Sequence, residues 1–153
     1  MTGGLLLVPL SAFAQLPIVV SAPVEINFGE LVVTAGAGGA ATISPLGART
    51  VSGGVSAISG AGLEVNGVLS VVASSGLAIE LSLTNATFTV DDIAGVGAPM
   101  SVTSFDIDGG GSAVTVTLTT LPQTFPIGAT LNVAAGQQDG TYIGNYSVRA
   151  NYQ

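Results

Sequence analysis

Apolar and polar residues alternate with a period of two over much of the chain, which is the pattern of half-buried β-strands. Near the amino end the alternation is unbroken over six apolar positions, and at the carboxyl end over four. These positions are Ile18, Val20, Ala22, Val24, Ile26 and Phe28 in the first stretch, and Tyr146, Val148, Ala150 and Tyr152 in the second. Because Pro23 cannot donate a ladder hydrogen bond, we expect the first strand at a sheet edge or bent at this residue.

Short strand candidates follow one another between these two stretches, separated by turn-forming runs of Gly, Ser, Asn and Asp. They are residues 31–33, 40–43, 63–65, 68–73, 78–83, 87–90, 101–107, 113–118 and 130–133. A helical period is not sustained anywhere over eleven residues, so helices are expected to be single turns at most. This pattern predicts one all-β domain built as an antiparallel sandwich or barrel.

The first fourteen residues differ from the rest, because they form a short apolar run that ends in the small residues Ala12 and Ala14. This pattern predicts a secretory signal peptide that is cleaved before Gln15, although no positively charged region precedes the run. The missing region leaves open a start upstream of Met1. A membrane-spanning helix would need roughly 20 apolar residues, and Pro9 interrupts this shorter run. We therefore expect residues 15–153 to form a single exported domain without a membrane span.

Charge and composition argue against two classes of function, nucleic-acid binding and enzymatic catalysis. Only Arg49 and Arg149 balance nine carboxylates, which gives a net charge of −7 and argues against a nucleic-acid partner. The chain contains no His, Cys or Lys, so a Ser or Thr nucleophile would have no obvious activating partner. We expect no enzymatic activity and no cofactor.

Two pairs of acidic residues could suggest a cation site. Asp106 and Asp108, followed by glycines, look like the beginning of a calcium loop. No further acidic ligand follows at the spacing that such a loop needs, so the sequence favours a strand that ends in a glycine turn. Asp91 and Asp92 likewise favour a turn or a cap. We therefore expect no metal site.

Four segments together resemble one bacterial family. They are Ile-Asn-Phe-Gly at residues 26–29, residues 43–55, residues 128–133 and the closing residues 140–153. These segments resemble the domain family of unknown function designated DUF4402, over nearly all of the chain after the leader. The closing pattern, Gly-x-Tyr-x-Gly and then Val-x-x-x-Tyr-Gln, is also similar to the carboxyl ends of chaperone–usher pilins and spore-coat-U-like secreted subunits.

The resemblance implies an immunoglobulin-like β-sandwich that lacks one strand of its own and is completed by an amino-terminal strand from a neighbouring subunit. Pilins often carry a long donor extension, whereas only residues 15–22 stand in that position here. On this interpretation the chain is an exported structural or adhesive subunit at a bacterial cell surface, reached through the periplasm. Its partners would be other copies of itself, related subunits or a periplasmic chaperone.

Specific residues carry this expectation. Ile18, Val20 and Ala22 are expected on the apolar side of a donated or edge strand. The acceptor-side or chaperone-paired strand would use Tyr146, Val148, Ala150 and Tyr152. Any β-sandwich needs alternating core residues at its first and last strands, so a purely structural interpretation of all seven positions stays open.

The rival function is a monomeric extracellular carbohydrate- or surface-binding module. Its ligand site would combine the loops at residues 105–111 and 136–139. Polymerisation or dependence on a chaperone would favour the subunit, and a monomer that binds a glycan would favour the module.

Overall fold

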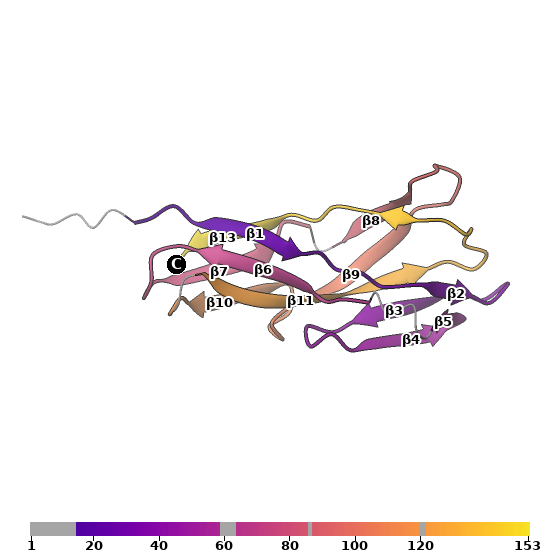
Figure 1. The fold of residues 1–153 in the computed structure, drawn as a ribbon, viewed down its shortest axis with the longest axis horizontal. Helices are drawn as coiled ribbons and strands as arrows, with labels where there is room; N and C mark the ends of the chain where they lie inside the picture. Colours follow the sequence, from indigo (N-terminus) through magenta and orange to yellow (C-terminus); the bar gives the residue numbers. More distant parts are fainter. Residues whose placement is uncertain (1–14, 59–63, 86, 120–121) are drawn as a thin grey trace, which may run out of the picture.

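The computed structural model describes residues 15–58, 64–85, 87–119 and 122–153, and the predicted leader lies outside them. All regular secondary structure in the described residues is β-strand, arranged along one elongated body (Figure 1). In chain order the strands are β1 (Val19–Val24), β2 (Leu31–Val33), β3 (Gly39–Ile43), β4 (Arg49–Gly53), β5 (Val55–Ala57), β6 (Gly67–Val72), β7 (Ala78–Leu83), β8 (Phe88–Asp92), β9 (Met100–Ile107), β10 (Ala113–Thr117), β11 (Gln123–Val133), β12 (Tyr142–Ile143) and β13 (Val148–Tyr152).

The strands form antiparallel sheets that pack face to face. The largest sheet has the order β1-β6-β11-β9-β8-β12 and curls, with β3 and β4 attached beside β11. Two smaller sheets have the orders β10-β7-β13 and β2-β5. All pairings between these strands are antiparallel. The predicted all-β fold, an antiparallel β-sandwich, is confirmed.

Strand β11 binds three neighbours and forms the spine of the large sheet. Along one side, residues 123–127 pair with β6 and residues 129–133 pair with β3, while the other side pairs with β9. Gly128 lies where the first side changes partner, and a Cβ at this position would collide with the carbonyl oxygen of Ile43. A residue without a side chain therefore lets β11 pass from β6 to β3.

The proline in β11 explains why the sequence pattern predicts only residues 130–133 of this strand. Proline cannot donate to a ladder and is normally confined to edge strands. Here the Pro126 carbonyl accepts a 2.8 Å hydrogen bond from the Asp108 backbone N–H. The proline nitrogen faces that same side, where the β9 ladder starts only at Ile127. Pairing with β6 therefore needs no donor from Pro126.

Alternate residues of β11 contribute to both halves of the core. Phe125 and Ile127 belong to a first buried cluster that also contains Leu69, Val71, Ala73, Ile79, Leu81, Ile107 and Leu118. The second cluster contains Ala129, Leu131 and Val133 of β11 together with Val55, Val90, Met100, Val102 and Phe105. Because the clusters share one strand, the two halves of the sandwich are packed as one unit.

The first strand is shorter than the alternation predicts. β1 pairs with β6 alone, and its register shifts between Ser21 and Val24. Pro23 lies within this bulge, so the expected position at an edge and the expected bend are both confirmed. The alternation resumes after the bulge at Ile26 and Phe28, which pack against the core outside any strand.

Most of the other predicted strands are confirmed to within two residues, namely β2, β3, β6, β7, β8, β9 and β10. The sequence pattern does not predict β4, β5 or β12. β4 is rich in polar and glycine residues and largely exposed, and β12 has only two residues. Of the candidate at residues 63–65, residue 63 lies outside the described part, and Val65 forms an isolated bridge with Asn27. No helix of the described ranges is long and apolar enough to span a membrane.

Candidate functional site

The carboxyl-terminal strand leaves one of its edges open. β13 pairs with β7, and the backbone groups of Ser147 and Gln153 point towards β7, because they bond to Thr84 and Ala78. In an antiparallel ladder, successive residues direct their backbone N–H and C=O groups to opposite sides. Every second residue between Ser147 and Gln153, starting at Val148, therefore directs these groups away from β7. These residues are Val148, Ala150 and Tyr152, and within the described chain no strand pairs with them on the outer side.

The side chains of the last strand face inward as the alternation predicts. Val148, Ala150 and Tyr152 are half-buried against the first core cluster, and Arg149 and Asn151 are exposed. Tyr146 lies just before β13 and contacts both clusters. The four predicted positions therefore share one face, with main-chain groups free along the edge.

The amino-terminal strand lies beside this open edge. Ile18 and Val20 are half-buried against the same cluster as the β13 side chains, while Val19 is 55% exposed. The predicted inward position of Ala22 is wrong, because the bulge before Val24 ends the alternation and leaves Ala22 exposed. β1 and β13 thus flank one seam of the core, and β1 of the same chain occupies the outer place next to β6 (Figure 1).

Three hydrogen bonds join the two ends of the chain at this seam. The Tyr152 hydroxyl donates to the Leu16 carbonyl oxygen at 2.7 Å and accepts from the Ser74 backbone N–H at 2.8 Å. The Leu16 backbone N–H donates to Ser74 Oγ at 2.9 Å. We call this arrangement the terminal latch, because it ties the start of β1 to the end of β13 and to the turn between β6 and β7.

Tyr146 places a polar group in the core without a partner. Its ring packs against Phe88 and Phe105, with centroid distances of 5.9 and 5.5 Å. Its hydroxyl is buried and makes no hydrogen bond to any residue that the structure describes. Burial raises the pKa of this phenol, and the nearby Glu25 carboxylate adds to the effect. Burial of an unpaired hydroxyl destabilises a fold, so Tyr146 is held by its ring contacts.

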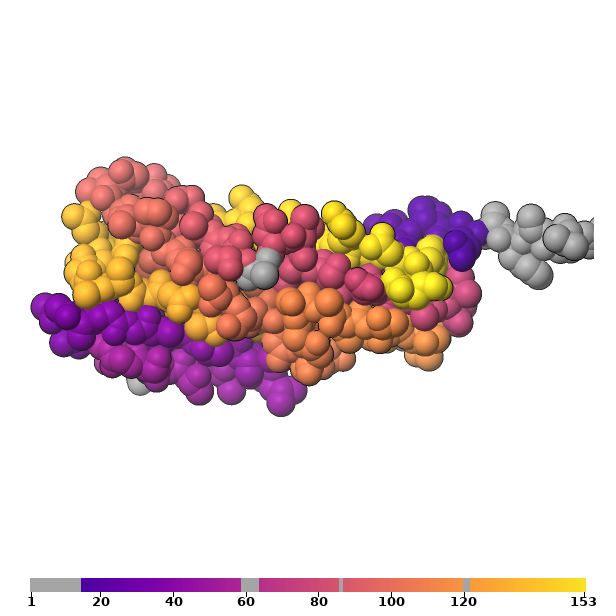
Figure 2. Space-filling model, turned by 180° about the vertical axis from the view of Figure 1, so that it is seen from behind, coloured from indigo at the N-terminus to yellow at the C-terminus, as the bar shows by residue number. Residues whose placement is uncertain are grey.

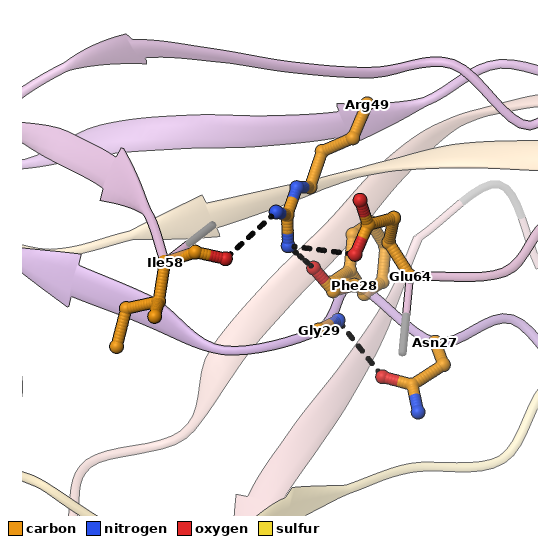
Figure 3. A network of polar contacts seen from close by, with 6 residues as sticks. All are labelled: Asn27, Phe28, Gly29, Arg49, Ile58 and Glu64. Carbon is orange, nitrogen blue, oxygen red and sulfur yellow. Dashed lines mark hydrogen bonds and ion pairs between the residues drawn. The ribbon is translucent and has the colours of Figure 1, made fainter. Parts of the chain in front are cut away.

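A second polar site forms around Arg49, whose side chain is only 8% exposed (Figure 3). Its Nη1 donates to the Phe28 carbonyl oxygen at 3.0 Å and lies 3.5 Å from the Glu64 carboxylate. Its Nη2 donates to the Ile58 carbonyl oxygen at 3.3 Å. Arg49 thereby joins β4 to the two flanking segments that carry Phe28 and Ile58. The alternation pattern does not indicate this role, and the available signal is that Arg49 is one of only two cations in the chain.

The turn that meets Arg49 has its own support (Figure 3). Asn27 Oδ1 accepts a 2.8 Å hydrogen bond from the Gly29 backbone N–H. Gly29 has φ of +73°, and a Cβ there would collide with Arg49 Nη1. Asn27 also pairs through its backbone with Val65. The Ile-Asn-Phe-Gly segment at residues 26–29 is thus a turn shaped around the guanidinium group.

At the end of the molecule away from the termini, Asp92 organises the loop between β8 and β9. Its carboxylate accepts backbone hydrogen bonds from Ala94, Val96 and Gly97 at 3.0–3.2 Å. The Gly97 N–H lowers the pKa of Asp92, desolvation opposes this, and the Val96 and Ala94 N–H groups lower it further. Asp92 is therefore a loop cap, as the sequence favours.

The neighbouring loop between β11 and β12 is braced against the Asp92 loop. Gln137 Nε2 donates to the Ala98 carbonyl oxygen at 2.6 Å and to the Tyr142 hydroxyl at 2.7 Å. The Tyr142 hydroxyl in turn donates to the Gln138 carbonyl oxygen at 2.9 Å. Gln137 Oε1 is buried and has no hydrogen-bond partner within the described ranges. The sequence pattern marks residues 136–139 as a loop, but it does not indicate that Gln137 bridges two loops.

The two loops expected to form one ligand site lie in different places. Residues 136–138 line a hollow with Val96 and Ala98, whereas Asp106 and Asp108 line another with the turn at residues 44–46. Asp106 Oδ1 accepts a hydrogen bond from the Gly111 backbone N–H at 2.9 Å, so it supports the turn between β9 and β10. Among the described residues, no group of three or more acidic side chains is placed to hold a metal ion.

Replacing Gly29 by alanine should destabilise the fold more than the same change at Gly36. Both glycines have positive φ, but nothing lies within 4 Å of a Cβ at Gly36. Gly36→Ala should therefore cost about 1–2 kcal/mol from backbone strain alone. Gly29→Ala should cost at least about 1 kcal/mol more, because it disrupts the hydrogen bonds of a buried guanidinium. Chemical denaturation measures both, and equal losses would contradict the role of Arg49.

The different surroundings of the Tyr152 and Tyr146 hydroxyls predict different results for two tyrosine-to-phenylalanine changes. Tyr152→Phe removes two hydrogen bonds and should destabilise the fold by about 1–2 kcal/mol. Tyr146→Phe removes a buried hydroxyl that has no partner, so it should be neutral or stabilising. Thermal denaturation of the two variants compares them directly. If Tyr146→Phe lowered the stability as much as Tyr152→Phe, the hydroxyl of Tyr146 would make a stabilising contact, which would contradict its assignment as an unpaired group.

Acid should loosen the Asp92 loop. A carboxyl group whose pKa is lowered in the folded state stabilises that state above the unfolded pKa, about 3.9, and loses this contribution as the pH falls towards the folded pKa. Hydrogen-exchange protection at Ala94, Val96 and Gly97 should therefore persist down to about pH 4 and fall as the pH is lowered further. Asp92→Asn should reduce it already at neutral pH. The Gly76 N–H bonds to the Leu118 carbonyl oxygen and serves as the control, since it should stay protected.

Comparison with known proteins identifies the family. A search of curated proteins and a search of solved structures each found no match. The family described as "Domain of unknown function (DUF4402)" matches residues 18–152. That range contains the Arg49 site, the Asp92 loop and the whole of both terminal strands. Since the match extends over far more than half of the chain, the protein belongs to the DUF4402 family.

Proposed function

We propose that this protein is an exported, non-enzymatic structural or adhesive subunit at the bacterial cell surface, assembled from copies of itself by β-strand addition. The observation that carries the proposal is the seam between β1 and β13. Both strands are sheet edges and both pack against the same core cluster, and no strand of the described residues pairs with the outer side of β13. Exposed strand edges of this kind are templates for pairing with another chain.

The weak attachment of β1 supports an exchange of this strand. Of its six residues only Val20 is half-buried, and the others are exposed. The bulge at Pro23 separates β1 from the bridge at Asn27, which leaves the exposed Glu25, before the packed side chain of Ile26, as a hinge. In an exchanged assembly β1 of one copy takes the place of β1 in the next and re-forms the same contacts. Such a swap is a low-cost route to oligomers, because few interactions are lost.

Composition supports the surface role. A chain with only two cations, and without His, Cys or Lys, lacks the usual activated nucleophiles and bases. Its polar groups are mainly hydroxyl, amide and backbone groups, which can pack against copies of the chain without strong repulsion. Export rests on the apolar leader at residues 1–14.

Cysteine trapping tests the exchange directly, because the chain has no cysteine of its own. Val19 and Val72 are directly paired on β1 and β6, and both side chains are exposed. Paired residues in an antiparallel ladder are close enough for a disulfide. A mixture of full-length Val19→Cys and Val72→Cys chains, folded together and oxidised, should therefore give covalent dimers. The Val19→Cys/Val72→Cys double variant in a self-complete monomer would instead give an internal disulfide.

Two controls make the result decisive. Leu46→Cys replaces Val19→Cys in one mixture, since Leu46 is 93% exposed and is not paired with β6. Dimers that form equally well with Leu46→Cys would reflect collision and would contradict exchange. Val20→Asp should abolish the oligomer, whereas Val19→Asp on the outer face should leave it intact. A monomeric wild type whose melting temperature falls with Val20→Asp would overturn the proposal.

A further inference from the structure

The exchange of β1 leaves the outer edge of β13 open. β1 lies beside this edge but belongs to the large sheet, and no backbone hydrogen bond in the described residues joins it to β13. Replacement of β1 by the same strand of another copy therefore adds no partner for β13. Figure 2 shows the carboxyl-terminal segment, in yellow, at the surface of the molecule. The edge is thus available to a further strand in the monomer and in the exchanged assembly.

The regularity of β13 suits the addition of a strand. It pairs with β7 over five residues, Val148–Tyr152, in a continuous register. It has neither a bulge nor a proline, two features that often protect an edge strand from pairing with another chain. By contrast, β1 contains the bulge at Pro23, and β12 has only two residues. Of these three edges, β13 offers the longest uninterrupted row of outward backbone groups.

A second copy of β13 fits this edge, because the strand can pair with itself in antiparallel orientation. Val148, Ala150 and Tyr152 direct their N–H and C=O groups away from β7. If Ala150 lies opposite Ala150 of the second copy, Val148 lies opposite Tyr152, and all three residues of each strand take part. About six hydrogen bonds then form between the strands. A two-fold axis relates the copies, so the same edge supplies both halves of the interface.

The position of Arg149 favours this register over its neighbours. A two-fold axis at Arg149 would place two guanidinium groups directly opposite one another, and like charges in such a pair are destabilising. An axis at Asn151 would carry Val148 past the end of the partner strand at Tyr152. The axis at Ala150 avoids both costs, because it places Arg149 opposite Asn151 of the second copy.

The outer face of the sheet β10-β7-β13 is electrically balanced, although the chain has a net charge of −7. Its strands carry two charged side chains on this face, Glu80 of β7 and Arg149 of β13. Asn151, which faces Arg149 of the second copy, is itself paired with Glu80. The guanidinium group of one copy and the carboxylate of the other therefore lie in one row across the interface. This complementarity favours a second copy as the occupant.

We propose that β13 pairs with β13 of a second copy about a two-fold axis at Ala150, which joins their three-stranded sheets edge to edge. The inference rests on the proposed function in taking copies of the chain as partners, but a monomer that keeps its own β1 has the same edge. The strand pair is smaller than a standard interface of about 20–30 residues a side, so the isolated dimer should be weak. Strand exchange would strengthen it by holding copies close together.

Sedimentation of the full-length chain over a range of concentrations tests the pairing, and the wild type should form a dimer whose fraction rises with concentration. Ala150→Pro should abolish the dimer, because it removes an outward N–H. It should keep the fold, since an edge strand tolerates proline where the N–H faces away from the sheet. Asn151→Pro is the matched control: its N–H is directed to β7, so this change should lower the melting temperature.

Charge reversal gives a second test that leaves the backbone unchanged. Arg149→Glu should weaken the dimer at least about tenfold, because it brings carboxylates together across the axis. Arg149→Glu/Glu80→Arg should restore the dimer. Ala113→Glu adds a carboxylate at an exposed position of β10, the opposite edge of the same sheet, and should leave the dimer intact. Melting temperatures identify any variant that fails to fold.

Disulfide trapping identifies the register. A mixture of full-length Arg149→Cys and Asn151→Cys chains should give covalent dimers on oxidation, because the two positions are directly opposite in the proposed pair. Arg149→Cys alone should stay uncoupled, since only an axis at that residue would bring its two copies together. Thr115→Cys, exposed on β10, replaces Arg149→Cys in a further mixture and measures coupling by collision.

Three outcomes would overturn the inference: a wild type that stays monomeric up to about 1 mM, a dimer that survives Ala150→Pro with an unchanged melting temperature, and equal coupling by Thr115→Cys and Arg149→Cys. The result is separable from strand exchange. Coupling of Arg149→Cys to Asn151→Cys, in a chain whose Val19→Cys and Val72→Cys variants stay uncoupled, would reject the exchange and support this pairing. The reverse would reject this pairing and support the exchange.

Discussion

The antiparallel pairing of β11 with three other strands is the constraint on which the rest of the fold depends. One side of β11 pairs first with β6 and then with β3, and the other side pairs with β9. Its inward side chains supply part of both core clusters. The switch of partner works because Gly128 admits the Ile43 carbonyl where any side chain would collide. The β3–β4 hairpin, and with it Arg49, is positioned by this crossing.

Arg49 shows how a chain of low charge uses a cation in its interior. The guanidinium group can donate five hydrogen bonds in a fixed planar arrangement. Here it satisfies two backbone carbonyl oxygens and faces one carboxylate, so the segments at residues 27–29 and 58 are tied to β4. A lysine would offer a single charged atom without this geometry. The turn at Asn27–Gly29 exists in its observed form because the guanidinium occupies the space beside Gly29.

Period-two alternation was sufficient to predict the all-β fold, most strand positions and the inward face of the last strand. It failed where a local backbone feature overrides the period. Ala22 is exposed because a bulge adds a residue before Val24. The pattern missed residues 123–129 of β11 because Pro126 argues against a central strand, whereas the proline is tolerated here because its carbonyl and nitrogen face the end of a ladder. The polar sites escaped prediction as well, but for a different reason. Arg49 with Glu64, and Gln137 with Ala98, join residues that are distant in sequence, and alternation carries no information on such contacts.

The two ends of the molecule use their polar groups differently, and this difference separates their roles. At one end the terminal latch uses Tyr152 and Ser74 to hold the start of β1. In a swapped assembly these bonds would re-form between copies, so the latch would contribute equally to the monomer and to the assembly. It would slow the exchange, because the bonds must break first, but it would not favour either state. At the other end Asp92 and Gln137 fix loops that expose aliphatic groups. Strand exchange at the first end would leave these loops uncovered, so an assembled array would present them once for each copy.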